Sequence, residues 1–252
     1  MGTNTKSRWF VGVSHDELKE CALYAFPHAG AGVTTVRPLC LELADTYTAF
    51  GVRLPGRESR LEDPVETVMP DLADKVAVEL LRHAQGRPVV LYGHCAGSAI
   101  AYEVARRLDP AMLRALVVSS HPAPGSLRRE PTWGLPRPEF LKQVVTDGYL
   151  PSMLLANEEL LDIVEPALRA DYELVENYEL ELYEAGTVEP VAVPTVAVHG
   201  RDDHTVEAAQ IEAWVALTTG PFRMLSLPGG HDLPSSRPAE LAAAVREALA
   251  EG

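Results

Sequence analysis

The chain has 252 residues, of which 46% are hydrophobic and 23% are charged, and its formal net charge is −14. This length is enough for one large domain with a buried core, and the composition is typical of a soluble globular protein. The negative charge disfavours nucleic acid and anionic membrane surfaces as partners. The sequence contains no apolar run of the length needed to cross a bilayer.

The first twenty residues lack the apolar segment of a secretory signal. The three cysteines, Cys21, Cys40 and Cys95, are an odd and low number. This count argues against a disulfide framework and for a reducing compartment. We therefore expect a cytoplasmic protein in which residues 1–252 form a single domain.

Short apolar runs rich in β-branched and aromatic residues alternate with helical patterns along the chain. Strands are predicted at Ala22–Phe26, Thr48–Arg53, Val89–Tyr92, Ala115–Ser119, Thr195–His199 and Arg223–Leu227. Helices are predicted near Val36–Ala44, Leu72–His83, Ala96–Leu108, Ala208–Leu217 and Pro238–Leu249. This alternation predicts an α/β fold with a mostly parallel sheet covered by helices on both faces. The continuous apolar character of the strands is typical of parallel strands buried on both faces.

The segment from about residue 122 to 185 interrupts this alternation. It contains no convincing strand, but it has amphipathic stretches at Glu139–Val145, Asn157–Val164 and Pro166–Tyr178. Ligands of such sheets bind outside the carboxyl ends of the strands. We expect the segment to be a helical lid, inserted in the domain, that roofs the site and excludes water.

A candidate nucleophile follows the predicted strand Val89–Tyr92. The strand runs into Gly93-His94-Cys95-Ala96-Gly97, and a helix-forming run follows at once. This is the pattern of a nucleophile elbow, with cysteine in place of the usual serine. The two glycines have no Cβ to clash in so sharp a turn, and the dipole of the following helix favours a thiolate. The alternative is a buried, inert cysteine, but the flanking glycines between strand and helix favour a nucleophile.

The acid and the base of such a site follow the nucleophile in the chain. Asp202 and Asp203 follow the predicted strand Thr195–His199, and we favour Asp203 because of its Gly-x-x-Asp spacing. The alternative is that both are ordinary turn aspartates. His231 follows two glycines after the strand Arg223–Leu227 and is the predicted base, with His204 as the second choice. No set of ligands at a suitable spacing predicts a metal site.

An oxyanion hole needs two backbone N–H groups directed at the developing negative charge. One is expected from Ala96, directly after the nucleophile. The other is expected from Ala29 in the loop Phe26-Pro27-His28-Ala29-Gly30-Ala31-Gly32. The alternative is a plain glycine-rich turn. The loop lacks the spacing of a phosphate-binding or dinucleotide-binding motif.

With these motifs identified, the chain resembles the type II thioesterases of the α/β-hydrolase fold, which serve non-ribosomal peptide and polyketide assembly lines. The resemblance runs from about Leu23 to the C-terminus. Its motifs are Phe26-Pro27-His28-Ala29-Gly30, Leu54-Pro55-Gly56-Arg57-Glu58-Ser59-Arg60, the elbow, Leu168-Arg169-Ala170-Asp171-Tyr172 and Gly229-Gly230-His231. It implies a triad of Cys95, Asp203 and His231, and no cofactor of the enzyme's own. It also implies substrates that are acyl or aminoacyl groups on the phosphopantetheine of acyl or peptidyl carrier domains, and we expect a monomer.

The sequence departs from this family at the nucleophile, where Gly-His-Ser-Met-Gly is usual. The cysteine is either natural to this chain or a replacement of serine. A small branch that resembles the family has cysteine there and shuttles aminoacyl groups between carrier proteins. The chain is therefore expected to release acyl groups by hydrolysis or, alternatively, to transfer them between carriers. A cysteine-dependent lactone or ester hydrolase and a non-catalytic docking module are further alternatives.

Carrier domains generally present an acidic helix, so a chain of net charge −14 needs a local basic patch to bind one. The candidates are the arginine pairs Arg57 and Arg60, Arg106 and Arg107, and Arg128 and Arg129. The alternative for any one pair is a solvated surface of mixed charge. We expect Arg128 and Arg129, at the edge of the lid, to contact the carrier.

Overall fold

A central sheet of seven strands organises the computed structural model, which describes residues 7–13, 18–150 and 152–250. The strands are β1 (Phe10–Gly12), β2 (Ala22–Phe26), β3 (Thr48–Val52), β4 (Val89–His94), β5 (Leu113–Ser119), β6 (Thr195–Gly200) and β7 (Phe222–Leu227). Their order in the sheet is β1-β3-β2-β4-β5-β6-β7. Strands β2 to β7 are parallel, and β1 pairs with β3 in the antiparallel direction. The predicted α/β-hydrolase fold, with a mostly parallel sheet, is confirmed.

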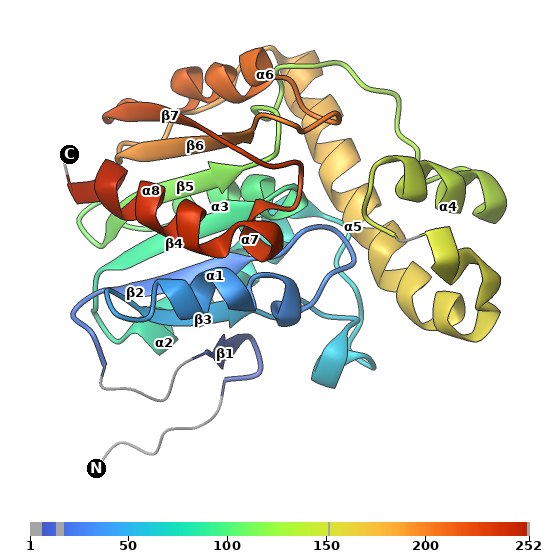
Figure 1. Ribbon diagram of the computed structural model, residues 1–252, viewed down its shortest axis with the longest axis horizontal. Coiled ribbons are helices and arrows are strands. Elements are labelled where there is room, and N and C mark those ends of the chain that lie inside the picture. The colour runs from blue at the N-terminus through green and yellow to red at the C-terminus, as the bar shows by residue number, and fades with distance from the viewer. Residues whose placement is uncertain (1–6, 14–17, 151, 251–252) are drawn as a thin grey trace.

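Helices cover both faces of the sheet (Figure 1). The helices of the described residues are α1 (Arg37–Glu42), α2 (Met69–Ala84), α3 (Ala96–Ala105), α4 (Arg137–Thr146), α5 (Glu158–Ala185), α6 (Ala208–Glu212), α7 (Leu233–Ser236) and α8 (Pro238–Ala250). Four short 3-10 turns lie at Val33–Thr35, Glu58–Arg60, Ser152–Ala156 and Ala213–Leu217. Among the described residues, none of these helices combines the length and the apolar character that a membrane span requires.

The alternation of side chains along the buried strands divides the core into two layers. Tyr24 and Leu91 face the layer that contains α2 and α3, whereas Leu23 and Val90 face the layer that contains α1 and α8. Both sides of these strands are therefore apolar, as the continuous apolar runs in the sequence predicted. The rigid sheet holds the carboxyl ends of its parallel strands along one edge.

The segment between β5 and β6 is helical, as predicted, but its helices differ from the prediction. The stretches expected at Asn157–Val164 and Pro166–Tyr178 form one helix, α5, which continues through Pro166. Leu161 and Leu168 are buried on either side of this proline. Packing of the flanking turns therefore outweighs the backbone hydrogen bond that proline cannot donate. In Figure 1, α4 and α5 lie beyond the ends of the strands at which the arrows point.

The strand β1 was not predicted. It has three residues and lies at the edge of the sheet, where it pairs Phe10 with Val52. So short a strand shows no alternating pattern in the sequence. Residues 1–6 and 14–17, which belong to the stretch in which no secretory signal was expected, lie outside the described residues.

Candidate active site

Cys95 occupies the turn between β4 and α3 in the conformation of a nucleophile elbow. Its φ and ψ are 53° and −129°, a backbone conformation that L-residues rarely adopt. A Cβ atom on Gly93 would lie 2.4 Å from the Gly97 carbonyl oxygen, and one on Gly97 would lie 2.4 Å from the Phe26 carbonyl oxygen. Both glycines are therefore required by close backbone contacts. The side chain of Cys95 is almost completely buried, with 3% of the residue exposed.

The predicted acid and base lie at the ends of the strands β6 and β7. Nδ1 of His231 donates to Oδ2 of Asp203 at 2.9 Å. The other carboxylate oxygen, Oδ1, accepts hydrogen bonds from the backbone N–H of Thr205 at 2.8 Å and from its hydroxyl at 2.7 Å. Ser120 donates its hydroxyl to the carbonyl oxygen of His231 at 2.9 Å. Both the ring and the backbone of the histidine are therefore held in place.

Asp202 and His204, the alternative acid and base, form no hydrogen bond with the side chains of Asp203 or His231 among the described contacts. Asp202 and His204 are exposed, and Asp202 accepts a hydrogen bond from the backbone N–H of Gly229 at 3.2 Å. His94 is buried, with Nδ1 3.0 Å from the hydroxyl oxygen of Ser119. Cys95, Asp203 and His231 are the predicted residues that the fold brings together.

The charges around Cys95 favour a thiolate. Burial alone would raise the pKa of the thiol, but its interactions with His121 and His231 lower it to about 5. Burial would lower the pKa of His231, but its hydrogen bond with Asp203 and its interaction with Cys95 raise it to about 10. Nε2 of His231 is buried without a well-aligned partner among the described residues. Such hydrogen bonds are often misaligned before substrate binds.

Of the two residues predicted for an oxyanion hole, Ala96 directly follows the nucleophile, and Ala29 belongs to a loop whose start is packed against the elbow. Ala96 begins α3, and Ala29 lies in the loop after β2; both are buried in the same apolar cluster as Cys95. The start of this loop is packed against the elbow, since a Cβ on Gly97 would also lie 2.5 Å from the Pro27 carbonyl oxygen. The backbone of the loop thus runs close to the turn that carries the thiol.

Two side chains that the sequence did not identify also reach Cys95. His121, in the loop after β5, is 7% exposed, and its Nε2 lies 2.7 Å from Oε1 of Glu179 on α5. Tyr149 comes from the segment between α4 and α5, and its side chain also interacts with the sulfur. Its ring stacks on His28, with centroids 5.8 Å apart, and lies 5.3 Å from the ring of His231. His121 follows a parallel strand directly, which is a signal that could have identified it.

Two of the arginine pairs that are candidates for carrier binding contact side chains of the protein itself. Arg57 is buried in an ion pair with Asp171. Arg60 is buried as well, with its guanidinium 3.8 Å from the ring centroid of Trp9. Arg106 and Arg107 both pair with the buried carboxylate of Glu103. These two candidate pairs are therefore engaged by carboxylates and an aromatic ring of the protein itself.

Arg128 and Arg129 are exposed, and Arg128 pairs with the exposed Glu130. They lie in the described segment that connects β5 to α4. This arginine pair therefore stays available at the surface.

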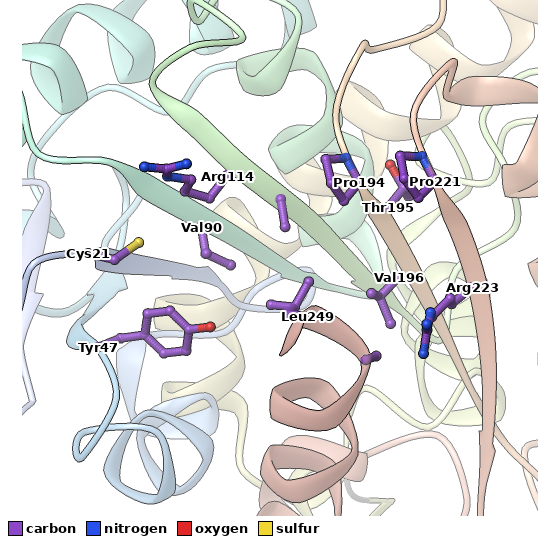
Figure 2. Close-up of a pocket in the computed structure, with 12 residues that line it drawn as sticks. Cys21, Tyr47, Val90, Arg114, Pro194, Thr195, Val196, Pro221, Arg223 and Leu249 are labelled. Carbon is purple, nitrogen blue, oxygen red and sulfur yellow. The ribbon is translucent and has the colours of Figure 1, made fainter. Parts of the chain in front are cut away.

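A cavity of about 390 Å³ lies at the amino ends of the parallel strands, whereas Cys95 lies at their carboxyl ends. Figure 2 shows its lining, which includes Cys21, Tyr47, Arg114 and Arg223. These residues come directly before, or at the start of, their strands. The cavity therefore contains none of the candidate active-site residues, which follow the carboxyl ends of β2, β4, β5, β6 and β7. No cluster of three or more His, Cys, Asp and Glu side chains in the described part of the chain could hold a metal ion.

Comparison with known proteins places these residues in a family context. The thioesterase domain family matches residues 22–249. A probable cadicidin biosynthesis thioesterase of Streptomyces griseus is 30% identical over 233 residues, which cover 90% of this chain and 62% of that protein. This chain thus spans less than two thirds of the length of that relative.

Two solved structures resemble the whole chain. The type II thioesterase BorB, from the borrelidin biosynthetic cluster, is 30% identical with a TM-score of 0.83, over 98% of this chain and 100% of that one. The thioesterase RedJ, from the prodiginine pathway of Streptomyces coelicolor, is 28% identical with a TM-score of 0.81. Its match covers 93% of this chain and 90% of that one.

Proposed function

The chain belongs to the thioesterase family, and from this premise we propose that it is a type II thioesterase of assembly-line biosynthesis. Its substrates are acyl or aminoacyl thioesters on the phosphopantetheine arm of a carrier domain. The observation that carries the proposal is a cysteine in an elbow turn beside a histidine that is hydrogen-bonded to a buried aspartate. Similarity to BorB, to RedJ and to the cadicidin biosynthesis relative supports a role in assembly-line biosynthesis.

Catalysis begins with attack of the Cys95 thiolate on the thioester carbonyl. The Cys95 Sγ–C bond forms, and negative charge develops on the carbonyl oxygen, where the N–H groups of Ala29 and Ala96 stabilise it. The bond to the phosphopantetheine sulfur then breaks, and His231 gives its proton to the leaving thiol. Asp203 orients the imidazole and stabilises its positive form. The product of this half-reaction is an acyl-Cys95 enzyme.

The second half-reaction needs a nucleophile that the now neutral His231 deprotonates. With water the enzyme releases a free acid and clears a stalled carrier. With the thiol of a second carrier it transfers the group. Cys95 favours the second outcome more than a serine would, because exchange of one thioester for another is nearly isoenergetic. Hydrolysis is the activity we propose, and transfer between carriers is the alternative that the cysteine favours.

The segment at residues 122–185 forms the lid in this proposal. Glu176 of α5 accepts hydrogen bonds from the backbone N–H groups of Thr132 and Trp133, at 2.7 and 2.9 Å. These bonds fix the loop before α4 onto the long helix α5. Arg128 and Arg129, exposed on this loop, are the proposed contact for the acidic carrier helix.

The test is intact-protein mass spectrometry of the enzyme mixed with acyl-loaded and aminoacyl-loaded carrier protein, with and without a second, empty carrier. Acyl mass on Cys95 followed by free acid identifies the hydrolase. Acyl mass that moves from Cys95 to the second carrier identifies the transferase. A carrier that stays loaded, with no acyl mass on the enzyme, contradicts the proposed function.

A further inference from the structure

The side chain of Cys95 interacts with two histidines, and each histidine forms an ion pair with a carboxylate. His231 pairs with Asp203 on one side, and His121 pairs with Glu179 on the other. The triad explains the first pair only. The second pair comes from different elements, the loop after β5 and the helix α5.

The fold fixes His121 beside the nucleophile through the backbone. The N–H of Cys95 donates to the carbonyl oxygen of Ser119 at 2.8 Å, so the end of β5 is bonded to the elbow two residues before the histidine. The carbonyl oxygen of His121 accepts a hydrogen bond from Nε1 of the buried Trp214 at 2.8 Å. Neither contact involves the imidazole, which is left to interact with Cys95 and Glu179.

Glu179 holds this imidazole in its positive form. Burial alone would lower the pKa of His121, but the carboxylate charge of Glu179 and the interaction with Cys95 raise it to about 9. His121 is therefore a cation at neutral pH.

Three further titratable groups near the sulfur, His94, Tyr149 and Tyr172, supply no positive charge. Burial lowers the pKa of His94 well below its ordinary value, so this ring is neutral. Burial raises the pKa of Tyr149 and of Tyr172, so both phenols are neutral as well. Among the described residues that interact with Cys95, His121 and His231 are the cations.

We propose that His121, held as an imidazolium by Glu179, is a second catalytic histidine that stabilises the Cys95 thiolate both as nucleophile and as leaving group. This role rests on the proposed function. On acylation, the electron pair of the thiolate forms the Sγ–C bond, and His121 keeps its proton. On deacylation, His231 takes the proton of water or of the incoming thiol. The Sγ–C bond then breaks, and its electron pair returns to a sulfur that His121 already faces.

In this arrangement His121 stabilises the thiolate, and His231 transfers protons. A single histidine must stabilise the thiolate and also move protons to and from the carrier thiol. With His121 as a fixed cation, Cys95 stays a thiolate when His231 is neutral. A thiolate that needs no proton to leave makes acyl-Cys95 more reactive toward the second nucleophile.

The first test follows alkylation of Cys95 by iodoacetamide against pH, with the modified cysteine located by peptide mass spectrometry. The variants are His121→Gln, Glu179→Gln and His231→Gln, and the matched control is His204→Gln, at an exposed histidine near the site. We expect the pKa of the thiol to rise by about one to two pH units in His121→Gln, because a positive charge that interacts with the thiolate is lost. The His204→Gln profile should superimpose on the parent.

His231→Gln tests the same proposal without any change at His121. A substantial thiolate fraction should persist at neutral pH in this variant, because the second cation remains. A pKa that returns to the ordinary cysteine range of about 8.5 in His231→Gln would overturn the proposal. So would a His121→Gln profile identical to that of the parent.

The leaving-group role is measured separately, as the decay of acyl-Cys95 by intact-protein mass spectrometry. Acyl enzyme should accumulate in Glu179→Gln and His121→Gln, with decay slower by roughly tenfold to a hundredfold. Unchanged decay in both folded variants contradicts this role. Because alkylation needs no carrier, a parent enzyme that fails to accept acyl groups would refute the proposed function and leave the test of the thiolate intact.

Discussion

Arg57 and Asp171 form a buried, bidentate ion pair, with Nη1 and Nη2 of the arginine 2.6 and 2.7 Å from the two carboxylate oxygens. The same carboxylate accepts a hydrogen bond from the backbone N–H of Gly30 at 2.7 Å. Three segments far apart in the chain therefore meet at Asp171: the loop after β2, the loop after β3 and the helix α5. These are three of the motifs on which the resemblance to type II thioesterases rests. The pair joins the loop that holds Ala29 to the helix that carries Glu179.

Asp171→Asn should destabilise the fold strongly, because it leaves the guanidinium of Arg57 buried against a neutral amide. Breaking one side of a buried pair typically costs about 3–5 kcal/mol. The free energy of unfolding in urea measures this loss. Arg128→Met, which breaks the exposed pair with Glu130, is the control and should leave the stability unchanged.

The double variant Arg57→Met with Asp171→Leu should be more stable than either single variant, since it buries no unpaired charge. If Asp171→Asn unfolds at the same urea concentration as the parent, the pair does not hold these three segments together.

The sheet was predictable because its strands are buried on both faces. Ala22–Phe26 and Val89–Tyr92 are continuous apolar runs, and each is a strand in the structure. The elbow was predictable for a related reason. The turn has no space for a Cβ at Gly93 or Gly97, so it requires glycine at both positions, and this spacing can be recognised in the sequence.

The contacts from the helical segment were not predictable in the same way. Glu179 meets His121 only because α5 continues through Pro166 and packs across the ends of the strands. A proline normally indicates a helix boundary, so the sequence predicted two shorter helices there. Tyr149 lies in a turn with no motif, and its position over Cys95 depends on how that helix packs. Tertiary packing, which local patterns do not record, decides both contacts.

Asp203→Asn should reduce turnover by roughly a hundredfold to ten-thousandfold. Burial lowers the pKa of His231, and the hydrogen bond with Asp203 and the interaction with Cys95 raise it. Without the carboxylate the pKa falls, so less imidazolium is present at neutral pH to protonate the leaving thiol. Steady-state hydrolysis of a small acyl thioester, measured between pH 5 and 9, reports the change.

Asp202→Asn is the matched control for this experiment. Asp202 is exposed and contacts the backbone of Gly229 rather than the imidazole. Its variant should hydrolyse the substrate at the rate of the parent. A loss of activity in Asp202→Asn with little loss in Asp203→Asn would mean that Asp202, and not Asp203, is the acid of the site.

Tyr149→Ala should make Cys95 more accessible. The ring of Tyr149 lies against His28 and His231, its side chain interacts with Cys95, and only 3% of Cys95 is exposed. We expect its removal to speed modification of Cys95 by a bulky maleimide several-fold. Tyr183→Ala, at an exposed tyrosine on the same helical segment, should have no effect. Equal rates for Tyr149→Ala and the parent would mean that other residues limit access to the thiol.

Cys95→Ser should shift the enzyme from transfer toward hydrolysis while it keeps the fold. Serine converts the thioester into an oxyester, and return of the acyl group from an oxyester to a carrier thiol is unfavourable, whereas cysteine makes both exchanges nearly isoenergetic. The measurement uses two carriers of different mass and compares label on the second carrier with free acid. Cys21→Ser, at a half-buried cysteine at the amino ends of the parallel strands, should behave as the parent does. If Cys95→Ser loads the second carrier as efficiently as the parent, the thiol has no special role in transfer, and hydrolysis alone accounts for the site.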